Sequence, residues 1–140
     1  MAKNTVTVRL HVWLETEEET LLGLGRTMLL NRIEEHGSIR KAAQSLGMSY
    51  RGAWGKIHAS EDILGVKLLQ ANGSKRDGCS LSEEGRHLRD MFQQWFDEVE
   101  QAAIDLAKEI FPWAITSFHE KDGIPCGNGA ASRPPLERDC

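Results

Sequence analysis

The stretch Gly37–Ile57 constrains the fold of this chain more than any other part of its 140 residues. Gly37 suits the left-handed position that closes a helix, and Ser38 is a good N-cap for a second helix. The apolar residues of this second helix fall on one side: Ile39, Ala42, Ala43 and Leu46. Gly47-Met48 then makes a tight turn, and Ser49 caps a third helix. The spacing predicts a helix-turn-helix.

The third helix, expected at Tyr50–Leu64, decides what such a motif does. Helical geometry predicts that one of its sides packs inward, and this side holds Tyr50, Ala53, Trp54, Ile57 and Leu64. The other side holds Arg51, Gly52, Gly55, Lys56 and Ala59. In a helix-turn-helix the second helix of the motif lies in the major groove of DNA, and its N-terminal residues meet base edges. The outward side therefore predicts a DNA-binding surface.

Residue types suggest a role for each position on this surface. Arg51 suits either a bidentate contact to guanine or a contact to phosphate. A phosphate contact positions the protein on DNA but does not read the base sequence. Lys56 is expected at phosphate, whereas Arg40 and Lys41 are either backbone contacts or solvated charges. The helix glycines either let DNA come close or only weaken the helix. The candidate DNA-binding residues are Arg40, Lys41, Ser49, Tyr50, Arg51, Gly52, Gly55, Lys56, Lys75 and Arg76.

Charge is unevenly distributed along the chain. The formal net charge is −4, which by itself argues against DNA. Between Gly37 and Ser80, however, seven basic residues face three acidic ones, so this segment carries +4 and the remaining residues carry −8. Phosphate binding depends on the local patch rather than on the total charge. The basic segment coincides with the predicted motif.

Alternating and helical patterns precede the motif. Thr5–Leu14 alternates apolar and polar residues with a period of two, which predicts one strand with a buried face. Thr20–Leu22 is expected to return as a short second strand. Arg26–His36 then has the apolar spacing of a helix.

A hairpin with the features of a wing follows the motif. Lys67–Gln70 and Cys79–Leu81 are expected to pair around the loop Ala71–Gly78, which has turn-forming residues. Lys75 and Arg76 lie in this loop, where they either reach phosphate or minor groove or are ordinary loop charges.

A long helix is predicted next, from Ser82 as N-cap to about Ile110, with Pro112 helping to end it. Its apolar residues step alternately by four and three, the spacing of a coiled-coil seam: Leu88, Phe92, Trp95, Val99, Ala102 and Leu106. So long an apolar stripe exceeds what the small head can cover. The seam predicts a homodimer, and these six residues are its candidate interface.

These patterns predict one α+β, mainly α domain: a winged helix-turn-helix over residues 5–111 with a dimer helix at about 83–110. Residues 112–140 are rich in Gly, Pro and small polar residues, which predicts a flexible tail. No apolar run is long enough to cross a membrane, and no signal-peptide pattern is present. The three cysteines show no CxxC spacing, so a reducing cytoplasm is the expected compartment.

The motif residues also resemble a known family. The run Gly37-Ser38-Ile39, then Ala42-Ala43, Gly47–Arg51 and Ala53-Trp54, resembles the N-terminal domain of molybdate-responsive ModE-type regulators. Leu22–Arg26 is similar to that family's entry into its first helix, and Leu81–Gly85 resembles a wing-to-helix link shared with LysR-type regulators. The resemblance implies a winged-helix dimer that binds double-stranded DNA and regulates transcription. Full-length members carry a molybdate-binding domain whose oxyanion-sensing residues have no counterpart here. The expectation is a stand-alone head without a cofactor.

Two other functions stay open at this point. Winged helices also serve as protein-interaction modules, and the acidic net charge favours that use. A metal or redox sensor would need soft ligands from His119, Cys126 and Cys140, whose spacing matches no zinc pattern, so no metal site is predicted. No HExxH, GxSxG or phosphate-cradling glycine motif is present, and an enzyme is therefore not expected.

Overall fold

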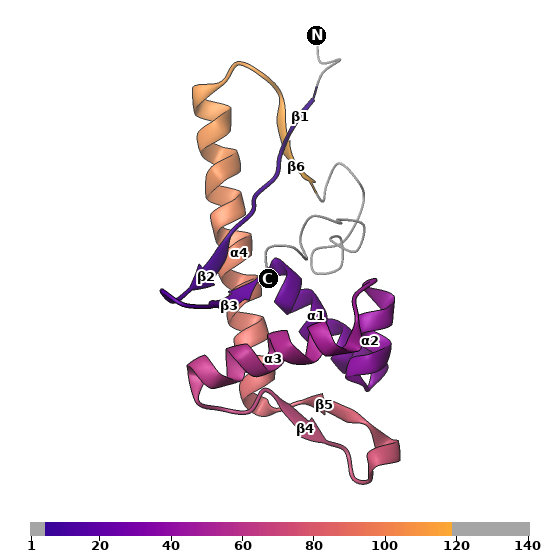
Figure 1. The fold of residues 1–140 in the computed structure, drawn as a ribbon. Helices are drawn as coiled ribbons and strands as arrows, with labels where there is room; N and C mark the ends of the chain where they lie inside the picture. The colour runs from indigo at the N-terminus through magenta and orange to yellow at the C-terminus, as the bar shows by residue number, and fades with distance from the viewer. Residues whose placement is uncertain (1–4, 119–140) are drawn as a thin grey trace.

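Three helices and a hairpin form a head, and one long helix extends away from it (Figure 1). The computed structural model describes residues 5–118, apart from the side chain of Lys75. The elements in chain order are β1 (Val6–Val8), β2 (Trp13–Glu15), β3 (Thr20–Gly23), α1 (Leu24–His36), α2 (Ile39–Ser45), α3 (Tyr50–Leu64), β4 (Leu69–Ala71), a short 3-10 helix (Lys75–Asp77), β5 (Cys79–Leu81), α4 (Glu83–Ile110) and β6 (Ile115–Ser117). This is the mainly α winged helix that the sequence predicts.

The predicted caps set the bounds of the helix-turn-helix. Gly37 ends α1 at a φ of 76°, a left-handed conformation that costs glycine no side-chain clash. The Ser38 Oγ accepts a hydrogen bond from the Lys41 backbone N–H at 3.0 Å and so begins α2. The Ser49 Oγ accepts one from Gly52 N–H at 2.9 Å and begins α3. Each cap satisfies a backbone donor that has no partner within the helix. The helix-turn-helix prediction is confirmed.

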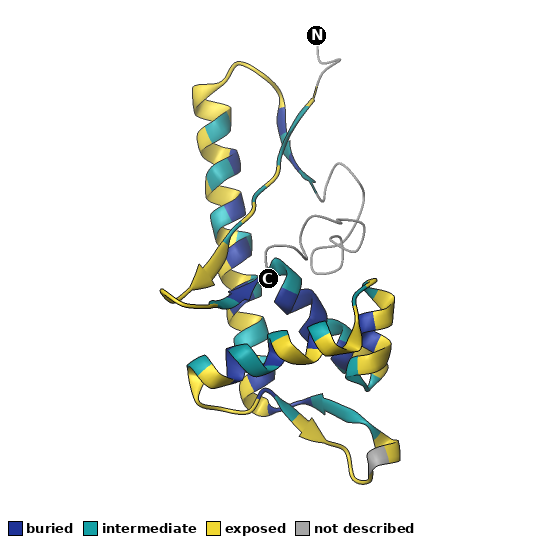
Figure 2. Ribbon diagram, in the orientation of Figure 1, coloured by how far each residue is buried: buried dark blue, intermediate teal, exposed yellow. Residues whose placement is uncertain are grey.

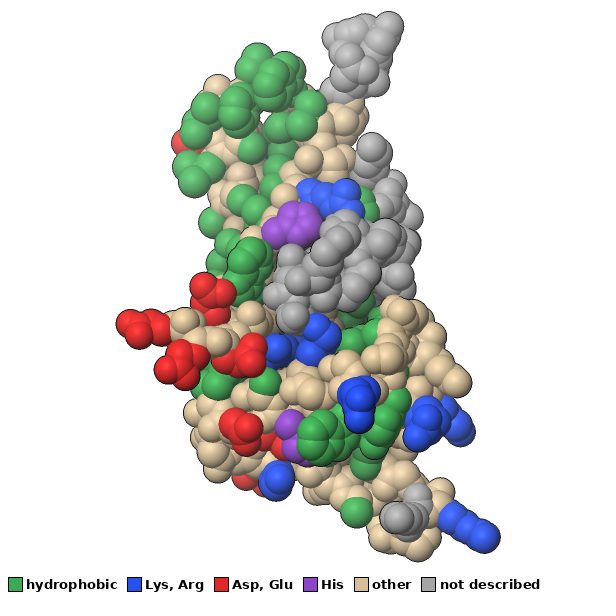
Figure 3. Space-filling view, viewed as in Figure 1, with side chains coloured by type: hydrophobic (Ala, Val, Ile, Leu, Met, Phe, Trp, Pro, Cys, Tyr) green, Lys and Arg blue, Asp and Glu red, His purple; other side chains and the backbone are tan. Residues whose placement is uncertain are grey.

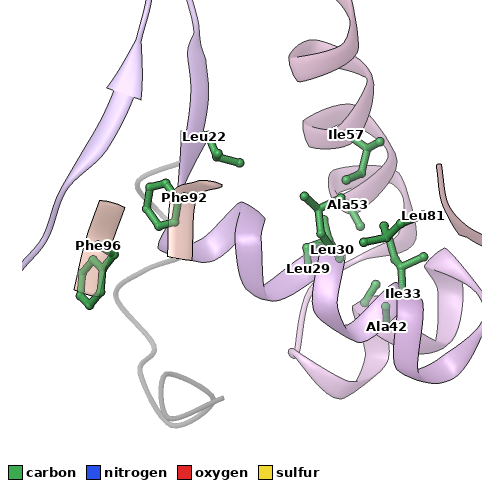
Figure 4. Packing of buried hydrophobic residues seen from close by; sticks show 11 residues of the cluster. Leu22, Leu29, Leu30, Ile33, Ala42, Ala53, Ile57, Leu81, Phe92 and Phe96 are labelled. Carbon is green, nitrogen blue, oxygen red and sulfur yellow. The ribbon is translucent and has the colours of Figure 1, made fainter. Parts of the chain in front are cut away.

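One apolar core joins α1, α2, α3, the wing and the first part of α4. Figure 4 shows most of its side chains gathered between the helices, with Phe92 and Phe96 standing apart from them, and Figure 2 shows the buried faces turned toward one another. The buried members are Leu22, Leu29, Leu30, Ile33, Ala42, Ala43, Ala53, Ile57, Leu81, Phe92 and Phe96. Because α4 contributes two phenylalanines to this core, the long helix is packed onto the head along its first part.

The inward side of α3 differs from the prediction. Ala53 and Ile57 are buried, but Tyr50 is 41% exposed, Trp54 45% and Leu64 37%. The buried stripe continues instead through Ser60 and Glu61. Placing Tyr50, Trp54 and Leu64 in the core was therefore wrong.

Internal hydrogen bonds explain why two polar residues replace apolar ones in this stripe. The Ser60 hydroxyl donates to the Leu21 carbonyl and accepts from the Arg26 guanidinium, whose Nη1 lies 2.9 Å from Ser60 Oγ. Arg26, itself buried, also donates to the Thr20 carbonyl. The Glu61 carboxylate accepts from Leu68 N–H at 2.8 Å. Buried polar groups with partners avoid the cost of desolvation, so α3 can turn this side inward.

The N-terminal strand prediction is corrected in its extent and in its partners. Two strands replace the single one: β2 pairs antiparallel with β3, and β1 pairs in parallel with β6. The register of the parallel pair aligns Val6 with Ile115 and Val8 with Ser117. Ending the domain at residue 111 was therefore wrong, since residues 115–117 are a strand of the folded unit. The predicted tail beyond residue 118 lies outside the described residues.

A carboxylate fastens α4 and the wing to α1. The Glu34 Oε1 accepts from Leu81 N–H and its Oε2 accepts from Arg86 Nε, both at 2.9 Å. Partial burial raises the pKa of Glu34, but these hydrogen bonds and the positive charges of Arg86 and Arg89 outweigh it, so the pKa lies below its ordinary value. The start of α4 is thus held in one orientation relative to the head. No helix within residues 5–118 combines the length and apolarity that a membrane crossing requires.

Candidate nucleic-acid interface

Helices α2 and α3 share a surface that is basic and aromatic. The Arg40 guanidinium of α2 lies over the Tyr50 ring of α3, 4.6 Å from its centroid. This cation–π contact joins the two helices at their outer edge. Lys41 and Arg51 are also exposed, one on each helix. The structure therefore brings Arg40 and Tyr50 into contact and leaves Lys41 and Arg51, their neighbours in sequence, exposed.

The two glycines of α3 have different reasons to be glycine. A Cβ on Gly52 would lie 3.0 Å from Ser49 Oγ, so Gly52 leaves room for the N-cap. A Cβ on Gly55 would meet nothing within 4 Å. Ser49 is therefore occupied in capping, whereas Gly55 leaves bare helix backbone on the exposed side.

Lys56 is placed less favourably than the other basic residues of the motif. It is half-buried and already makes an interaction within the folded chain. A contact with phosphate would have to compete with this interaction.

Charges are segregated over the visible face of the molecule (Figure 3). Lys and Arg side chains lie over α2, α3 and the wing, whereas acidic side chains gather mainly at the turn between β2 and β3, with others over the end of α3. Of the three acidic residues in the basic segment, Glu61 is buried, and Asp77 accepts hydrogen bonds from the backbone and hydroxyl of Ser74. Asp62 alone of the three is exposed without such a contact among those described. Glu61 lies 3.9 Å from Lys67 Nζ, whereas Asp62 and Asp77 remain exposed charges, so seven basic residues face three acidic ones in this segment.

The wing is anchored at its base. Gly78 has a φ of 77°, and a Cβ built on it would lie 2.0 Å from the Gly37 carbonyl oxygen. Cys79 N–H donates to this same oxygen at 2.9 Å. The hairpin therefore packs backbone to backbone against the turn between α1 and α2. Arg76 is exposed near the wing tip, and Lys75 belongs to the same 3-10 helix.

Sequence reasoning missed the aromatic centre of the surface. Trp54 stacks on His58, with ring centroids 3.7 Å apart and planes inclined by 17°. The spacing of four residues on α3 could have revealed that Trp54 is exposed. Ala53, Ile57, Ser60 and Glu61 lie on one helix face, but the last two are polar. A prediction that considers only apolar residues therefore places the buried face of α3 too close to Trp54.

The predicted dimer seam on α4 divides into two neighbouring stripes. Phe92 is 2% exposed and belongs to the chain's own core, so its place in the predicted interface was wrong. The helix turns Phe92 and Phe96 toward the head because α1 and β3 lie there. Trp95, Ala102 and Leu106 are exposed, while Leu88 and Val99 are half-buried. Further exposed apolar side chains lie on or just beyond α4, where Figure 3 shows a hydrophobic surface: Met91, Ile110, Phe111 and Trp113.

No group of three or more His, Cys, Asp or Glu side chains able to hold a metal ion occurs between residues 5 and 118. The hypothetical tail ligands His119, Cys126 and Cys140 lie outside the described residues.

Comparisons with known proteins agree with this geometry. Residues 24–86 match the family model described as "Bacterial regulatory helix-turn-helix protein, lysR family". The molybdenum transport protein ModE of Azotobacter vinelandii is 33% identical over 99 residues, which is 69% of this chain and 36% of that protein. The molybdenum-pterin-binding protein MopB of Rhodobacter capsulatus is 33% identical over 69 residues, 48% of this chain and 26% of that protein.

Among solved structures, the CbnR_DBD–DNA complex superposes with a TM-score of 0.50 at 19% identity, covering 63% of this chain and 97% of that one. This likeness supports the fold. The architecture is that of a winged helix-turn-helix, and residues 24–86 are similar to the lysR family of helix-turn-helix proteins. Within that class, the resemblance to ModE-type regulators is confirmed. The chain spans about a third of the length of its ModE relative.

Proposed function

We propose that this protein is a DNA-binding transcriptional regulator that inserts α3 into the major groove. The observation that carries the proposal is the exposed surface of α2 and α3, where Arg40, Lys41 and Arg51 surround aromatic side chains. Basic residues on one face supply the attraction to phosphate, which accounts for most of the affinity of such proteins for DNA. The anchored wing carries Arg76 toward the flanking backbone or minor groove.

We also propose that it binds as a homodimer through α4. The exposed stripe of Trp95, Ala102 and Leu106 continues into Phe111 and Trp113, whose rings stack 4.9 Å apart. Large exposed apolar patches on a protein mark interaction sites. A second copy suits this surface because one helix face pairs with itself about a two-fold axis, and paired heads match paired half-sites on DNA.

Binding to duplex DNA at increasing salt concentration tests the proposal. A pool of random duplexes is titrated at about 50 mM salt and again at higher salt, and affinity is expected to fall steeply because each neutralised phosphate releases counterions. Selection from the same pool then gives the preferred sequence. Absence of binding at about 50 mM salt would contradict the proposal and favour a protein-interaction module.

Replacing Arg51 with alanine is expected to weaken specific binding by about 1–3 kcal/mol if its guanidinium reads a base. Competition with duplexes altered at single positions measures the effect, because loss of a base contact relaxes the preference at one position. Lys108→Ala is the matched control, since it removes the same charge from an exposed site near the far end of α4. A loss of affinity that is uniform across sequences would instead make Arg51 a phosphate contact.

A further inference from the structure

Trp54 presents a rigid apolar plane in the middle of α3. Its side chain is 45% exposed, and its indole is stacked face to face on the His58 imidazole. His58 Nδ1 lies 3.0 Å from the Trp54 carbonyl oxygen, and its Nε2 lies 3.8 Å from Glu61 Oε1. Since Glu61 is buried and bonded to Leu68 N–H, a continuous series of contacts runs from the core to the indole. The indole is therefore held in place and not a loose surface side chain.

The neighbours of Trp54 place it on the surface that the proposed function assigns to DNA. Residues three and four positions apart share a helix face, so Trp54 lies beside Arg51 and Tyr50 on one side and His58 on the other. The next residue, Gly55, has open space where a side chain would be. A ligand that approaches α3 from outside therefore meets the indole without obstruction from its successor.

The chemistry of the major groove offers such an apolar plane one kind of partner. Base edges there present hydrogen-bond donors and acceptors, together with the C5-methyl group of thymine, which apolar side chains contact. Arg51 lies three positions before the indole on α3, and Arg40 of α2 lies over the ring of Tyr50, four positions before it, so the surrounding charge suits DNA rather than an apolar protein partner.

We propose that Trp54 is a specificity-determining residue that packs against a thymine methyl group in the major groove. The inference rests on the proposed DNA-binding function and deepens it. In this arrangement Arg51 and Trp54 read neighbouring features of the same groove, one by hydrogen bonding or charge and the other by apolar contact. His58 acts as a positioning residue that keeps the indole flat against the helix.

Replacing thymine with deoxyuridine tests this directly, because the change removes the methyl group and leaves base pairing intact. Each thymine of the selected duplex is substituted in turn, and affinities are measured for the wild-type protein and for Trp54→Ala. At one position the wild type is expected to lose about fourfold in affinity, the fold-change that corresponds to about 0.8 kcal/mol for one buried methyl group. Trp54→Ala is expected to bind both duplexes equally.

Two further variants make the result decisive. Leu64→Ala removes another exposed apolar side chain from α3, near its C-terminal end, and is expected to keep the fourfold ratio. If Trp54→Ala binds too weakly to measure, Trp54→Phe takes its place in the comparison. This variant retains an aromatic plane and is expected to keep part of the fourfold ratio. Thermal unfolding checks that each variant is folded.

The outcomes separate the inference from the function on which it rests. If the wild type binds the unmodified duplex but no thymine position responds to deoxyuridine, or if Trp54→Ala keeps the fourfold ratio, Trp54 does not read a methyl group and DNA binding still stands. If the wild type binds no duplex at all, the proposed function fails first and the inference fails with it.

Discussion

Replacing Trp95 with aspartate is expected to convert the proposed homodimer into a monomer at micromolar concentration. Trp95 is 38% exposed on the outer stripe of α4, and its ring meets Phe92 edge to face with centroids 5.6 Å apart. Removal of a central interfacial tryptophan typically costs about 2 kcal/mol or more, and a buried unpaired carboxylate adds to that cost. Sedimentation of both proteins at several concentrations measures the change.

DNA binding is expected to weaken in parallel, because a dimer presents two linked heads. Linking two binding modules raises the apparent affinity by about 10²- to 10⁴-fold when both engage. Gln101→Glu is the matched control: it also adds one negative charge to α4, at an exposed site away from the stripe, and is expected to remain dimeric. A wild type that sediments as a monomer at micromolar concentration would contradict the homodimer.

Replacing Gly78 with alanine is expected to destabilise the fold by about 2–5 kcal/mol. An L-residue in the left-handed region costs about 1–2 kcal/mol, and overpacking adds about 1–3 kcal/mol. Both apply here, because Gly78 has a φ of 77° and its Cβ would lie 2.0 Å from the Gly37 carbonyl oxygen. Denaturant unfolding followed by circular dichroism measures the loss, and DNA binding through the wing is expected to weaken as well.

Substitutions at two other glycines separate the backbone strain from the steric clash in this loss of stability. Gly65 has a φ of 72° but open space around its Cβ position, so Gly65→Ala reports the backbone strain alone. Gly55 is helical with open space, so Gly55→Ala is expected to stabilise the fold by about 0.5–1 kcal/mol. If Gly78→Ala costs no more than Gly65→Ala, the hairpin is not held against the turn after α1.

Local chemistry made the helix-turn-helix predictable from sequence. Ser38 and Ser49 cap their helices through contacts within three residues, and Gly37 closes α1 within its own turn. Such features depend on neighbours in the chain, so spacing alone reveals them. The bounds of β5 and of α4 were predicted for the same reason, whereas β4 begins two residues later than the predicted Lys67–Gln70 and includes Ala71.

Distant partners decide the features that were not predicted. The inward side of α3 depends on Arg26 and Leu21, which satisfy Ser60 from other elements. Phe92 fits a coiled-coil seam as well as it fits a core, and only the position of the head assigns it to the core. An alternating segment indicates a strand but does not name its partner, which for Val6 is Ile115.

The pairing of β1 with β6 has a consequence for the order in which the molecule folds. Contacts that hold the head together, such as the hydrogen bond between Arg86 and Glu34, join residues nearer in sequence than the β1–β6 pair, which joins the two ends of the described chain and closes a loop that contains every other element. Loop closure costs entropy that such short strands repay only in part. We therefore expect this pair to assemble after the head and to open first during partial unfolding, as an independent zone of fast amide exchange.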